Sequence, residues 1–416
     1  MLLSEYEYRT LLEPLIRPEV AAELGPAERT EASAMVALSL LCEPGDRVPG
    51  FLLGADISAE GLVREICAGS SAASVAANFG PSVVQQLSDE LETDWPSIWK
   101  AALERWKPRA IKTDLLDALE FMGNRGSGLS VPHRITFRGA ADYPELLSDL
   151  GPGSPYALWM AGQTELLDSP SRVSIVGTRL ASHYGREVTA DLATVAAQSG
   201  ITTVSGGAFG IDAVVHEVAA ALGAPTVSVM AGGLANLYPR SNLSLFKSLV
   251  PNGVLISENV PTVVPAKWRF LARNRLIAAL GQATILVEAG ATSGATSTGR
   301  HAVGLGRTVA VVPGQIGSSR SVGCHDFINE FPGLVRVVAR PHDIRELAGL
   351  GAQIQVTADG LGSLEKRALD TFNLRPIEAW EVQRLSGLTV RELRIALGSL
   401  ETQGLISRSG TAYVRS

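Results

Sequence analysis

The hydrophobic residues of the first 130 positions recur at the spacing of an α-helix. Examples are "TEASAMVALSLLCEPG" (30–45) and "WPSIWKAALERWKPRAIKTDLLDALEFMG" (95–123), in which Pro and Gly interrupt the helical runs and β-branched runs are nearly absent. Apolar residues three and four positions apart form one face of a helix, and that face packs on a core. The sequence therefore predicts a small all-helical domain over residues 1–130.

The middle of the chain has a different period. After a lead-in of short apolar runs and turn residues from position 136, short β-branched runs alternate with helical stretches. The six predicted strands are 173–177, 202–205, 225–230, 254–257, 283–288 and 308–312. Such alternation predicts a parallel sheet with helices on both faces. We expect this α/β domain to span residues 136–345, with any ligand at the carboxyl ends of its strands.

The last part of the chain predicts a third, compact module. Residues 346–362 contain several glycines and no clear period, and we interpret them as a linker. Residues 363–416 then predict a helix, a turn, a second helix and a hairpin that turns near 409–410. Thr389 and Glu392 have the spacing of a capping box at the start of the second helix. This is the outline of a winged helix-turn-helix.

Composition limits where a polyanion could bind. The 416 residues are 46% hydrophobic and 19% charged, and the formal net charge is -6. These values are typical of a globular protein, and 416 residues are enough for two or three domains. A net acidic protein does not adhere to nucleic acid over its whole surface, so any nucleic-acid site must be local.

The cysteines and the apolar runs indicate a compartment. Cys42, Cys67 and Cys324 lie far apart and lack metal-ligand spacing, so we expect neither a disulfide framework nor a zinc site. Residues 1–30 lack the apolar core of an export signal, and the longest apolar run, 34–42, is too short to span a bilayer. We expect a cytoplasmic protein without membrane contact.

The turn after the first predicted parallel strand is "GTRLASHYGRE" (177–187). A dinucleotide cofactor would need Gly-x-Gly-x-x-Gly here, and its absence predicts that no such cofactor binds. Instead, Gly177 permits close approach to the backbone, Thr178 offers a hydroxyl, and Arg179 offers a planar guanidinium suited to phosphate. A helix that begins near Ser182 would add free N–H groups. The alternative is an ordinary tight turn with a surface arginine.

A second cationic cluster lies in "RFLARNRLIAAL" (269–280). If a helix begins just after Phe270, then Arg273, Asn274 and Arg275 occupy its first turn, where cations oppose the helix dipole. This placement predicts an anion bound between them, and Phe270 offers a face on which a base can stack. The alternative is a set of surface arginines paired with carboxylates, with Phe270 in the core.

Two glycine-rich stretches follow other predicted strands. In "VSGGAFGIDAVVH", Ser205 and Gly206 stand at a strand end, where glycine admits a ligand or another strand. A Ser-Asp-His triad is not predicted, because Gly-x-Ser-x-Gly is absent and Asp212 and His216 are more simply a polar pair on one helix face. The stretch "EAGATSGATSTGRHAVGLGR" (288–307) indicates either an anion cradle at a helix start or a Ser/Thr-rich cap without a ligand.

These motifs resemble the DNA processing protein A family (DprA, also called Smf) of bacterial proteins, which bind single-stranded DNA and load the RecA recombinase. The similarity covers most of residues 142–324. It rests on nine strings in this order: "DYPELL", "SIVGTRLASHYG", "VSGGAFGIDAVVH", "SVMAGGLANLYPRSN", "GVLISE", "FLARNRLIAAL", "ILVEAGATSGATSTGRHAV", "GRTVAVVPG" and "SVGCHDFI".

The resemblance implies an extended Rossmann-like domain whose basic pocket holds DNA phosphates and a base, with no cofactor and no turnover. It also implies a homodimer, a helical SAM-like domain before the sheet and a winged-helix-like domain after it. The biological setting implied is natural transformation or homologous recombination.

The resemblance assigns DNA contacts to two motifs, Gly-Ser/Thr-Arg and Phe-x-x-Arg-Asn-Arg. To these we add Ser205 and Gly206, which stand at the end of a predicted strand. The residues expected to contact DNA are Gly177, Thr178, Arg179, Ser205, Gly206, Phe270, Arg273, Asn274 and Arg275. Gly207 and Phe209 depart from the family pattern, which has an aliphatic and a small residue at these places. Because these two residues differ from the family pattern, the resemblance does not determine the shape of the DNA-binding pocket.

An enzymatic alternative stays open at this point. Related Rossmann-like proteins include nucleotide phosphoribohydrolases, in which Glu258 or Glu288 at a strand end would act on a ribosyl bond. The Pro-Gly-Gly-x-Gly-Thr-x-x-Glu string of those enzymes is absent. We find no carboxylate pair, metal cluster or nucleophile with a base, so we expect no catalytic residue, no bound metal and no enzyme.

A third alternative concerns the C-terminal module, which would read duplex DNA through Arg391 and Arg394 on one helix face. Residues 361–416 carry eight Lys and Arg against six Asp and Glu. This balance favours a solvated or protein-docking face.

Overall fold

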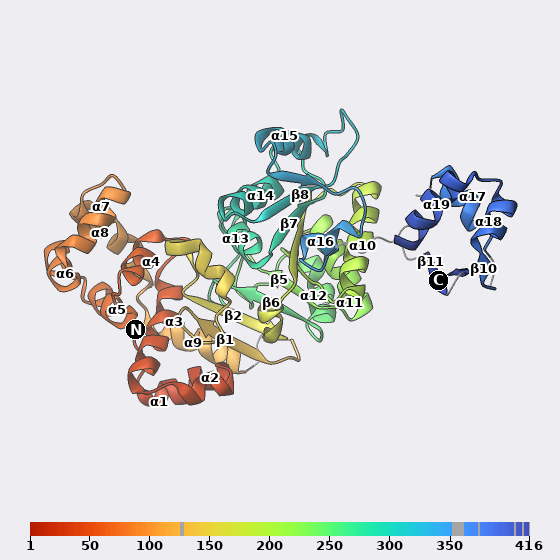
Figure 1. Ribbon diagram of the computed structural model, residues 1–416. Helices are drawn as coiled ribbons and strands as arrows, with labels where there is room; N and C mark the ends of the chain where they lie inside the picture. Colours follow the sequence, from red (N-terminus) through yellow and green to blue (C-terminus); the bar gives the residue numbers. More distant parts are fainter. Residues whose placement is uncertain (125–128, 352–361, 373–374, 403–404, 410–411, 416) are drawn as a thin grey trace. The chain divides into compact units, whose positions relative to one another are not determined.

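A computed structural model describes residues 1–124, 129–351, 362–372, 375–402, 405–409 and 412–415 (Figure 1). Contacts divide the chain into two compact units, Met1–Gly351 and Ala352–Ser416, and each is described by itself. Among the described residues, no helix is long and apolar enough to cross a membrane, and no group of three or more His, Cys, Asp or Glu side chains is placed to hold a metal ion. The three cysteines are free.

The first unit is built around a nine-stranded sheet (Figure 1). Its strands are β1 (His133–Phe137), β2 (Ala157–Gly162), β3 (Arg172–Val176), β4 (Thr202–Ser205), β5 (Thr226–Val229), β6 (Gly253–Ser257), β7 (Ala283–Leu286), β8 (Thr308–Val311) and β9 (Val335–Val337). Their spatial order is β1-β2-β6-β5-β4-β3-β7-β8-β9. All neighbours from β6 to β9 are parallel, whereas β1 and β2 form an antiparallel edge. The chain order reverses between β3 and β7, which makes a topological switch point.

Helices cover both faces of this sheet because the parallel strands are apolar on both sides. One face packs against α13 (Lys267–Leu280), α14 (Gly294–Gly304) and α15 (Val322–Glu330). The other face packs against α10 (His183–Gln198), α11 (Ile211–Leu222) and α16 (Asp343–Leu347). A further helix, α12 (Leu243–Leu249), lies beside α11. Along β3, Ile175 and Val176 belong to opposite faces, as the alternation of a strand requires.

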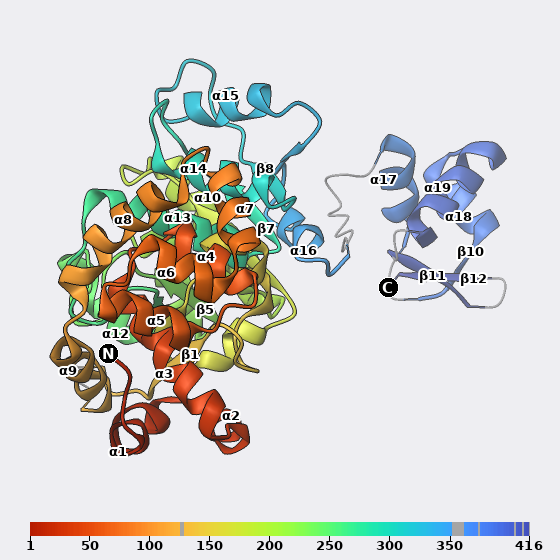
Figure 2. The same cartoon turned by 90° about the vertical axis from the view of Figure 1, so that its left-hand side faces the viewer.

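The N-terminal region is helical, as Figure 2 shows from the side on which these red and orange helices face the viewer. Its helices are α1 (Glu5–Glu7), α2 (Pro18–Glu23), α3 (Pro26–Leu41), α4 (Arg47–Gly54), α5 (Ala59–Ala68), α6 (Ala72–Phe79), α7 (Pro81–Glu90), α8 (Trp95–Trp106) and α9 (Lys112–Gly123). Ser58, Ser71 and Asp94 cap three of them by accepting backbone N–H bonds. Trp99 of α8 and Trp159 of β2 belong to one hydrophobic cluster, so the helices and the antiparallel edge of the sheet share a core.

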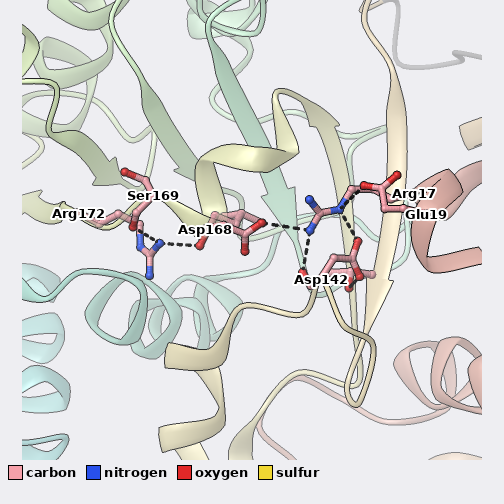
Figure 3. Close-up of polar contacts among 8 residues, drawn as sticks. Arg17, Glu19, Asp142, Asp168, Ser169 and Arg172 are labelled. Atoms are coloured by element: carbon pink, nitrogen blue, oxygen red, sulfur yellow. Dashed lines mark hydrogen bonds and ion pairs between the residues drawn. The ribbon is translucent and has the colours of Figure 1, made fainter. Parts of the chain in front are cut away.

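A partly buried ion pair also connects the helical region to the sheet. Arg17, just before α2, donates from Nε to Asp142 at 2.8 Å and pairs with Asp168 at 3.2 Å (Figure 3). The hydroxyl of Thr136 in β1 donates to the same Asp142 carboxylate at 2.6 Å. Because Asp142 is buried, loss of Arg17 would leave a carboxylate without its charge partner. Arg17 therefore fixes the helical region to the loop between β1 and β2.

The second unit contains α17 (Ser363–Leu369), α18 (Ala379–Ser386) and α19 (Val390–Thr402), with an antiparallel sheet of β10 (Ile377–Glu378), β12 (Ala412–Arg415) and β11 (Ile406–Ser409). The predicted capping box is present before α19. The Thr389 hydroxyl accepts from the Glu392 N–H at 3.3 Å, and the Glu392 carboxylate accepts from the Thr389 N–H at 2.8 Å. Residues 410–411, at the predicted hairpin turn, and 352–361, most of the predicted linker, lie outside the described residues.

The fold class predicted from the sequence is confirmed: a helical N-terminal region, a Rossmann-like sheet with helices and a small C-terminal unit. The six predicted strands correspond to β3 through β8, each within two residues at either end. Strands β1, β2 and β9 were not predicted. β2 is "ALWMAG", without a β-branched residue, and β9 has only three residues. The domain boundaries at 130, 136, 345 and 363 stay predictions.

Candidate functional site

A cavity of about 760 Å³ lies at the switch point between β3 and β7, and we call it the switch-point cavity. Its walls come from the loop after β3, the first half of α13, and the segment after β7 that leads into α14. These parts meet because parallel strands place their carboxyl ends on one edge of the sheet. The charged residues that line it are Arg179, Lys267 and Arg273, with Asp212 as the carboxylate.

The predicted residues Gly177, Thr178 and Arg179 all line the switch-point cavity. The Thr178 N–H donates to the carbonyl of Glu288 at 2.7 Å, which ties the loop after β3 to the loop after β7. A Cβ on Gly177 would lie 2.5 Å from Cγ1 of Ile211, so the loop crosses α11 without room for a side chain. The lack of a side chain at Gly177 is thus required by α11, and the approach of a ligand to this backbone stays a prediction.

The N-terminus of α10 is occupied by a side chain of the protein itself. The backbone N–H of Ser182, the N-cap residue, donates to the Glu288 carboxylate at 2.9 Å, and the Ser182 hydroxyl donates to it at 2.6 Å. The same hydroxyl accepts from the Gly185 N–H at 3.0 Å. A carboxylate at this place satisfies the positive end of the helix dipole. Two of the N–H groups that we expected to be free for a phosphate, those of Ser182 and Gly185, are therefore bonded within the protein.

Helix α13 begins at Lys267, a full turn earlier than predicted. Arg273, Asn274 and Arg275 lie beyond its first turn, and all three are buried. The prediction that they crowd the positive end of the helix dipole is wrong. The physical reason is that the residue before the helix is Ala266, which provides no side-chain cap and therefore no start signal.

Arg273 is the buried cation of the cavity, with only 4% of its surface exposed. Its guanidinium donates to the carbonyl of Val229 at the end of β5. A Cβ on Gly206 would overlap Nη1 of Arg273, so glycine leaves the space that the guanidinium fills. Burial lowers the pKa of Arg273 to about 10, against the opposing effect of the Asp212 carboxylate, and the side chain stays charged at neutral pH. Its Nε is buried and has no hydrogen-bond partner among the described residues.

Arg179 is held at the mouth of the cavity by an aromatic ring. Its Cζ lies over the Phe270 ring, 4.9 Å from the centroid, and the Tyr238 ring meets Phe270 edge-on at 5.7 Å. A cation–π contact of this kind orients the guanidinium. Phe270 lines the cavity as predicted, but Arg179 covers the ring face that was expected to stack with a base.

Asn274 connects α13 to the start of α14. Its Nδ2 donates to the carbonyl of Gly294 at 3.1 Å. The Ser293 hydroxyl caps α14 by accepting from the Ala295 N–H at 3.2 Å. Ser293, Gly294 and Ala295 all line the switch-point cavity, so the N-terminus of this helix forms part of its wall. The glycine- and hydroxyl-rich stretch after β7 thus lines the cavity and also caps α14, so both alternatives given for it, an anion cradle and a helix cap, stay open.

Three predicted contact residues are not among those that line the cavity: Ser205, Gly206 and Arg275. Arg275 donates from Nη1 and Nη2 to the Glu258 carboxylate at 2.9 and 2.5 Å, and both residues are buried. Ser205 is fully buried at the end of β4, where its hydroxyl donates to the Ile175 carbonyl at 2.7 Å. The alternative of an arginine paired with a carboxylate therefore holds for Arg275, whose charge is already neutralised.

The carboxylates of the enzymatic alternative are both engaged. Glu258 pairs with Arg275, and Glu288 caps α10. His216 is fully buried, with Nδ1 2.9 Å from the Thr226 hydroxyl, and it takes part in no triad with Ser205. This geometry gives no support to a phosphoribohydrolase.

Sequence reasoning missed Lys267 and Tyr238, which also line the cavity. Tyr238 lies in the string "SVMAGGLANLYPRSN", so the motif was noted but its aromatic residue was given no role. Arg269, by contrast, turns away from the cavity and pairs with Glu43 of the N-terminal region at 3.0 Å. The three arginines at 269–275 thus have three different partners: Glu43 for Arg269, the Val229 carbonyl for Arg273 and Glu258 for Arg275.

A recessed cavity with three cations, at the switch point of a Rossmann-like sheet that lacks a dinucleotide fingerprint, has the chemistry that suits an anionic ligand. Residues 134–347 match the model of the DNA recombination-mediator protein A family, and the chain belongs to this family. The resemblance noted from the motifs is confirmed.

Three known proteins illustrate what this chain is similar to. A DNA processing protein DprA of Mycobacterium tuberculosis is 39% identical over 258 residues, which are 61% of this chain and 66% of the relative, just under two thirds of its length. The X-ray structure of DprA from Streptococcus pneumoniae has 26% identity and a TM-score of 0.55 over 76% of this chain and 97% of that chain. DprA of Helicobacter pylori, described for its single-stranded DNA binding mode, has 29% identity and a TM-score of 0.48 over 53% of this chain and 97% of that chain.

Proposed function

We propose that this chain binds single-stranded DNA in the switch-point cavity and acts as a recombination mediator. The observation that carries the proposal is the convergence of Arg179, Lys267 and Arg273 on one cavity at the carboxyl edge of the sheet. Cations placed in this way neutralise phosphates whatever the base sequence. Membership of the DNA recombination-mediator protein A family supports the same function.

Two features favour a single strand over a duplex. Arg273 is almost completely buried, so a phosphate reaches it only when the strand itself enters the cavity. The guanidinium plane of Arg179 and the ring of Tyr238, which is 45% exposed, offer faces to unstacked bases. The bases of a duplex are stacked inside the double helix, so they cannot stack on Arg179 or Tyr238.

The geometry narrows the contacts expected from the sequence. We propose that Arg179, Arg273, Asn274 and Thr178 meet the strand, together with the backbone at Gly177. Phe270 positions Arg179, and Gly206 makes room for Arg273. Arg275 and Ser205 support the fold, since their side chains are buried and bonded within the protein.

The family resemblance extends the proposal beyond DNA binding. We propose that the protein acts in the cytoplasm as a homodimer, that it loads RecA onto the bound strand without catalysis of its own, and that it serves natural transformation or homologous recombination. Light scattering measures the dimer. The RecA ATPase rate on DNA covered by single-strand binding protein, with and without this chain, tests the loading step, and an unchanged rate would contradict it.

The DNA-binding test is a titration of labelled oligo-dT and a duplex of equal length at several salt concentrations. The variants are Arg179→Ala and Arg273→Ala, with Arg64→Ala as the matched control, since Arg64 is an exposed arginine of α5 in the N-terminal region. We expect tighter binding of the single strand by the wild type. Each cavity variant should lower the slope of log affinity against log salt by about 0.7, the value for one lost phosphate contact. Arg64→Ala should behave as the wild type.

Arg179 is exposed, so its variant reports on binding without a risk to folding. The buried Arg273 variant needs a circular dichroism spectrum and a thermal melt beside the titration. Wild-type affinity in both folded variants would refute the cavity assignment, and equal affinity for the duplex would refute the single-strand preference. If the wild type binds neither DNA, release of nucleosides from nucleotide monophosphates is the assay to perform next.

A further inference from the structure

A second cavity of about 420 Å³ lies beside the switch-point cavity. Its lining residues are Arg179, Leu180, Ala181, Arg186, Phe209 and Gly210, and we call it the Phe209 cavity. Arg179 and Leu180 line both cavities, so they form the divide between them. Both volumes lie within the range of small-ligand sites, about 300–1,000 Å³.

The two loops that form the Phe209 cavity are locked together by a glycine. Gly210 has φ +78°, and a Cβ there would overlap the carbonyl oxygen of Thr178. The same carbonyl accepts from the Ile211 N–H at 3.2 Å. The loop after β4 is thus pressed against the loop after β3, which makes Phe209 and Arg179 walls of one cavity. Phe209 is 44% exposed, so its ring is open to a ligand and not part of the core.

The charge of the Phe209 cavity is positive. Arg179 and Arg186 line it, and its lining residues, all within the described part of the chain, include no carboxylate. Arg186 has Glu217 at 3.4 Å, but both side chains are about half exposed, and a pair of this kind contributes little and opens readily. Arg320 adds a cation nearby, where its Nε donates to the Leu180 carbonyl at 3.1 Å. An open aromatic ring beside cations is the combination that accepts a base together with its phosphate.

We propose that the Phe209 cavity is a second nucleotide subsite. A strand held in the switch-point cavity continues across Arg179 and Leu180 and places a further base on the Phe209 ring, with Arg186 at its phosphate. This inference rests on the proposed function, since the occupant is the next nucleotide of the same strand. The shared Arg179 side chain is what makes the two cavities one path.

The test is a length series of oligo-dT, from one nucleotide to eight, titrated against wild type, Phe209→Ala and Phe209→Tyr. Leu222→Ala is the matched control, because Leu222 is an exposed apolar residue at the far end of α11, the helix that follows Phe209. We expect wild type and Phe209→Ala to bind the shortest oligomers alike and to diverge once the strand reaches the second cavity. Beyond that length Phe209→Ala should bind roughly fivefold more weakly or worse, as loss of one stacked base predicts. Phe209→Tyr and Leu222→Ala should follow the wild type.

A single 2-aminopurine moved along an eight-nucleotide strand gives an independent measurement, because its fluorescence falls when it stacks. One position should be quenched in the wild type and bright in Phe209→Ala. The subsite is refuted if the affinity of Phe209→Ala for oligo-dT equals that of the wild type at every length. It is also refuted if the affinity falls by the same factor at every length, because that result would indicate a role of Phe209 in the first cavity or in folding. Wild-type binding that depends on Arg179 but not on Phe209 would overturn the subsite alone. Failure of the wild type to bind any oligomer would overturn the proposed function with it.

Discussion

Gly206 and Arg273 share one volume: the guanidinium of Arg273 fills the place into which a side chain on residue 206 would project. Gly206 is glycine for reasons of space, because its backbone does not adopt the left-handed conformation that favours glycine. The sequence indicated Gly206 as a place where a ligand or another strand comes close to the backbone. In the structure, the group that comes close to it is a side chain of the protein.

Gly206→Ala should therefore weaken DNA binding without unfolding the protein. The atoms that must move are the far end of a long side chain, so the fold persists while the Arg273 guanidinium leaves its position. Loss of one charge-assisted hydrogen bond predicts an oligo-dT affinity about tenfold lower or worse. Fluorescence anisotropy and a thermal melt measure both effects. Gly304→Ala, at the end of α14 with open space around its Cβ position, is the control and should change neither. An unchanged affinity in Gly206→Ala would show that the position of Arg273 does not matter for DNA.

Arg275 and Arg179 should respond in opposite ways to replacement by alanine. Arg275→Ala leaves the buried Glu258 carboxylate without its partner, and we expect a loss of about 3–5 kcal/mol in the free energy of unfolding. Arg179→Ala removes an exposed side chain and should cost little stability but most of the DNA affinity. Urea unfolding beside oligo-dT titration separates the two effects.

The buried pair offers its own control. Replacement of both partners, as Arg275→Met with Glu258→Leu, removes both charges at once and should recover most of the stability lost in Arg275→Ala. If Arg275→Ala is as stable as the wild type but binds DNA weakly, Arg275 contacts the strand after all, as the sequence motif suggested.

The sequence predicted the parallel part of the fold well because six buried strands carry β-branched runs between helices, and that pattern is local. It did not predict β2, whose place depends on pairing with β6, a contact between residues far apart in the chain. The shared core of Trp99 and Trp159 also escaped prediction, because helical periodicity does not say what a helix packs against.

The candidate site was predicted in part for a similar reason. Motif spacing indicated Arg179 and Arg273, and both line the switch-point cavity. The same spacing gave Arg275 an equal role, although its partner Glu258 lies 17 residues away in the sequence, at the end of β6. Only the fold decides which cation faces a cavity and which faces a carboxylate.

The C-terminal unit provides a test of the duplex-reading alternative. Arg391 and Arg394 are both exposed on α19. We expect the double variant Arg391→Ala with Arg394→Ala to keep the wild-type affinity for oligo-dT, because these residues are not among those that line the switch-point cavity. The same titration with duplex DNA should show weak binding in both proteins. A large loss of duplex affinity in the double variant would instead establish this helix as a duplex-binding face.

His216 predicts how the stability of the first unit depends on pH. Burial lowers its pKa to about 3 from an ordinary value of 6.5, with the Arg273 charge acting in the same direction. The unfolded chain therefore binds a proton below pH 6.5 that the folded protein does not accept until about pH 3, and stability falls as the pH falls through this window. At pH 4 the loss of unfolding free energy from this one residue is about 3 kcal/mol.

The variant His216→Leu tests this prediction. It lacks the titrating group, and the hydroxyl of Thr226 keeps its bonds to Thr203. Urea unfolding of both proteins at pH 7, 5.5 and 4 should give a difference in unfolding free energy that grows with acidity in favour of the variant, while the carboxylates common to both cancel. If the unfolding free energies of the two proteins change with pH in parallel, His216 takes up its proton over the same pH range in the folded protein as in the unfolded chain.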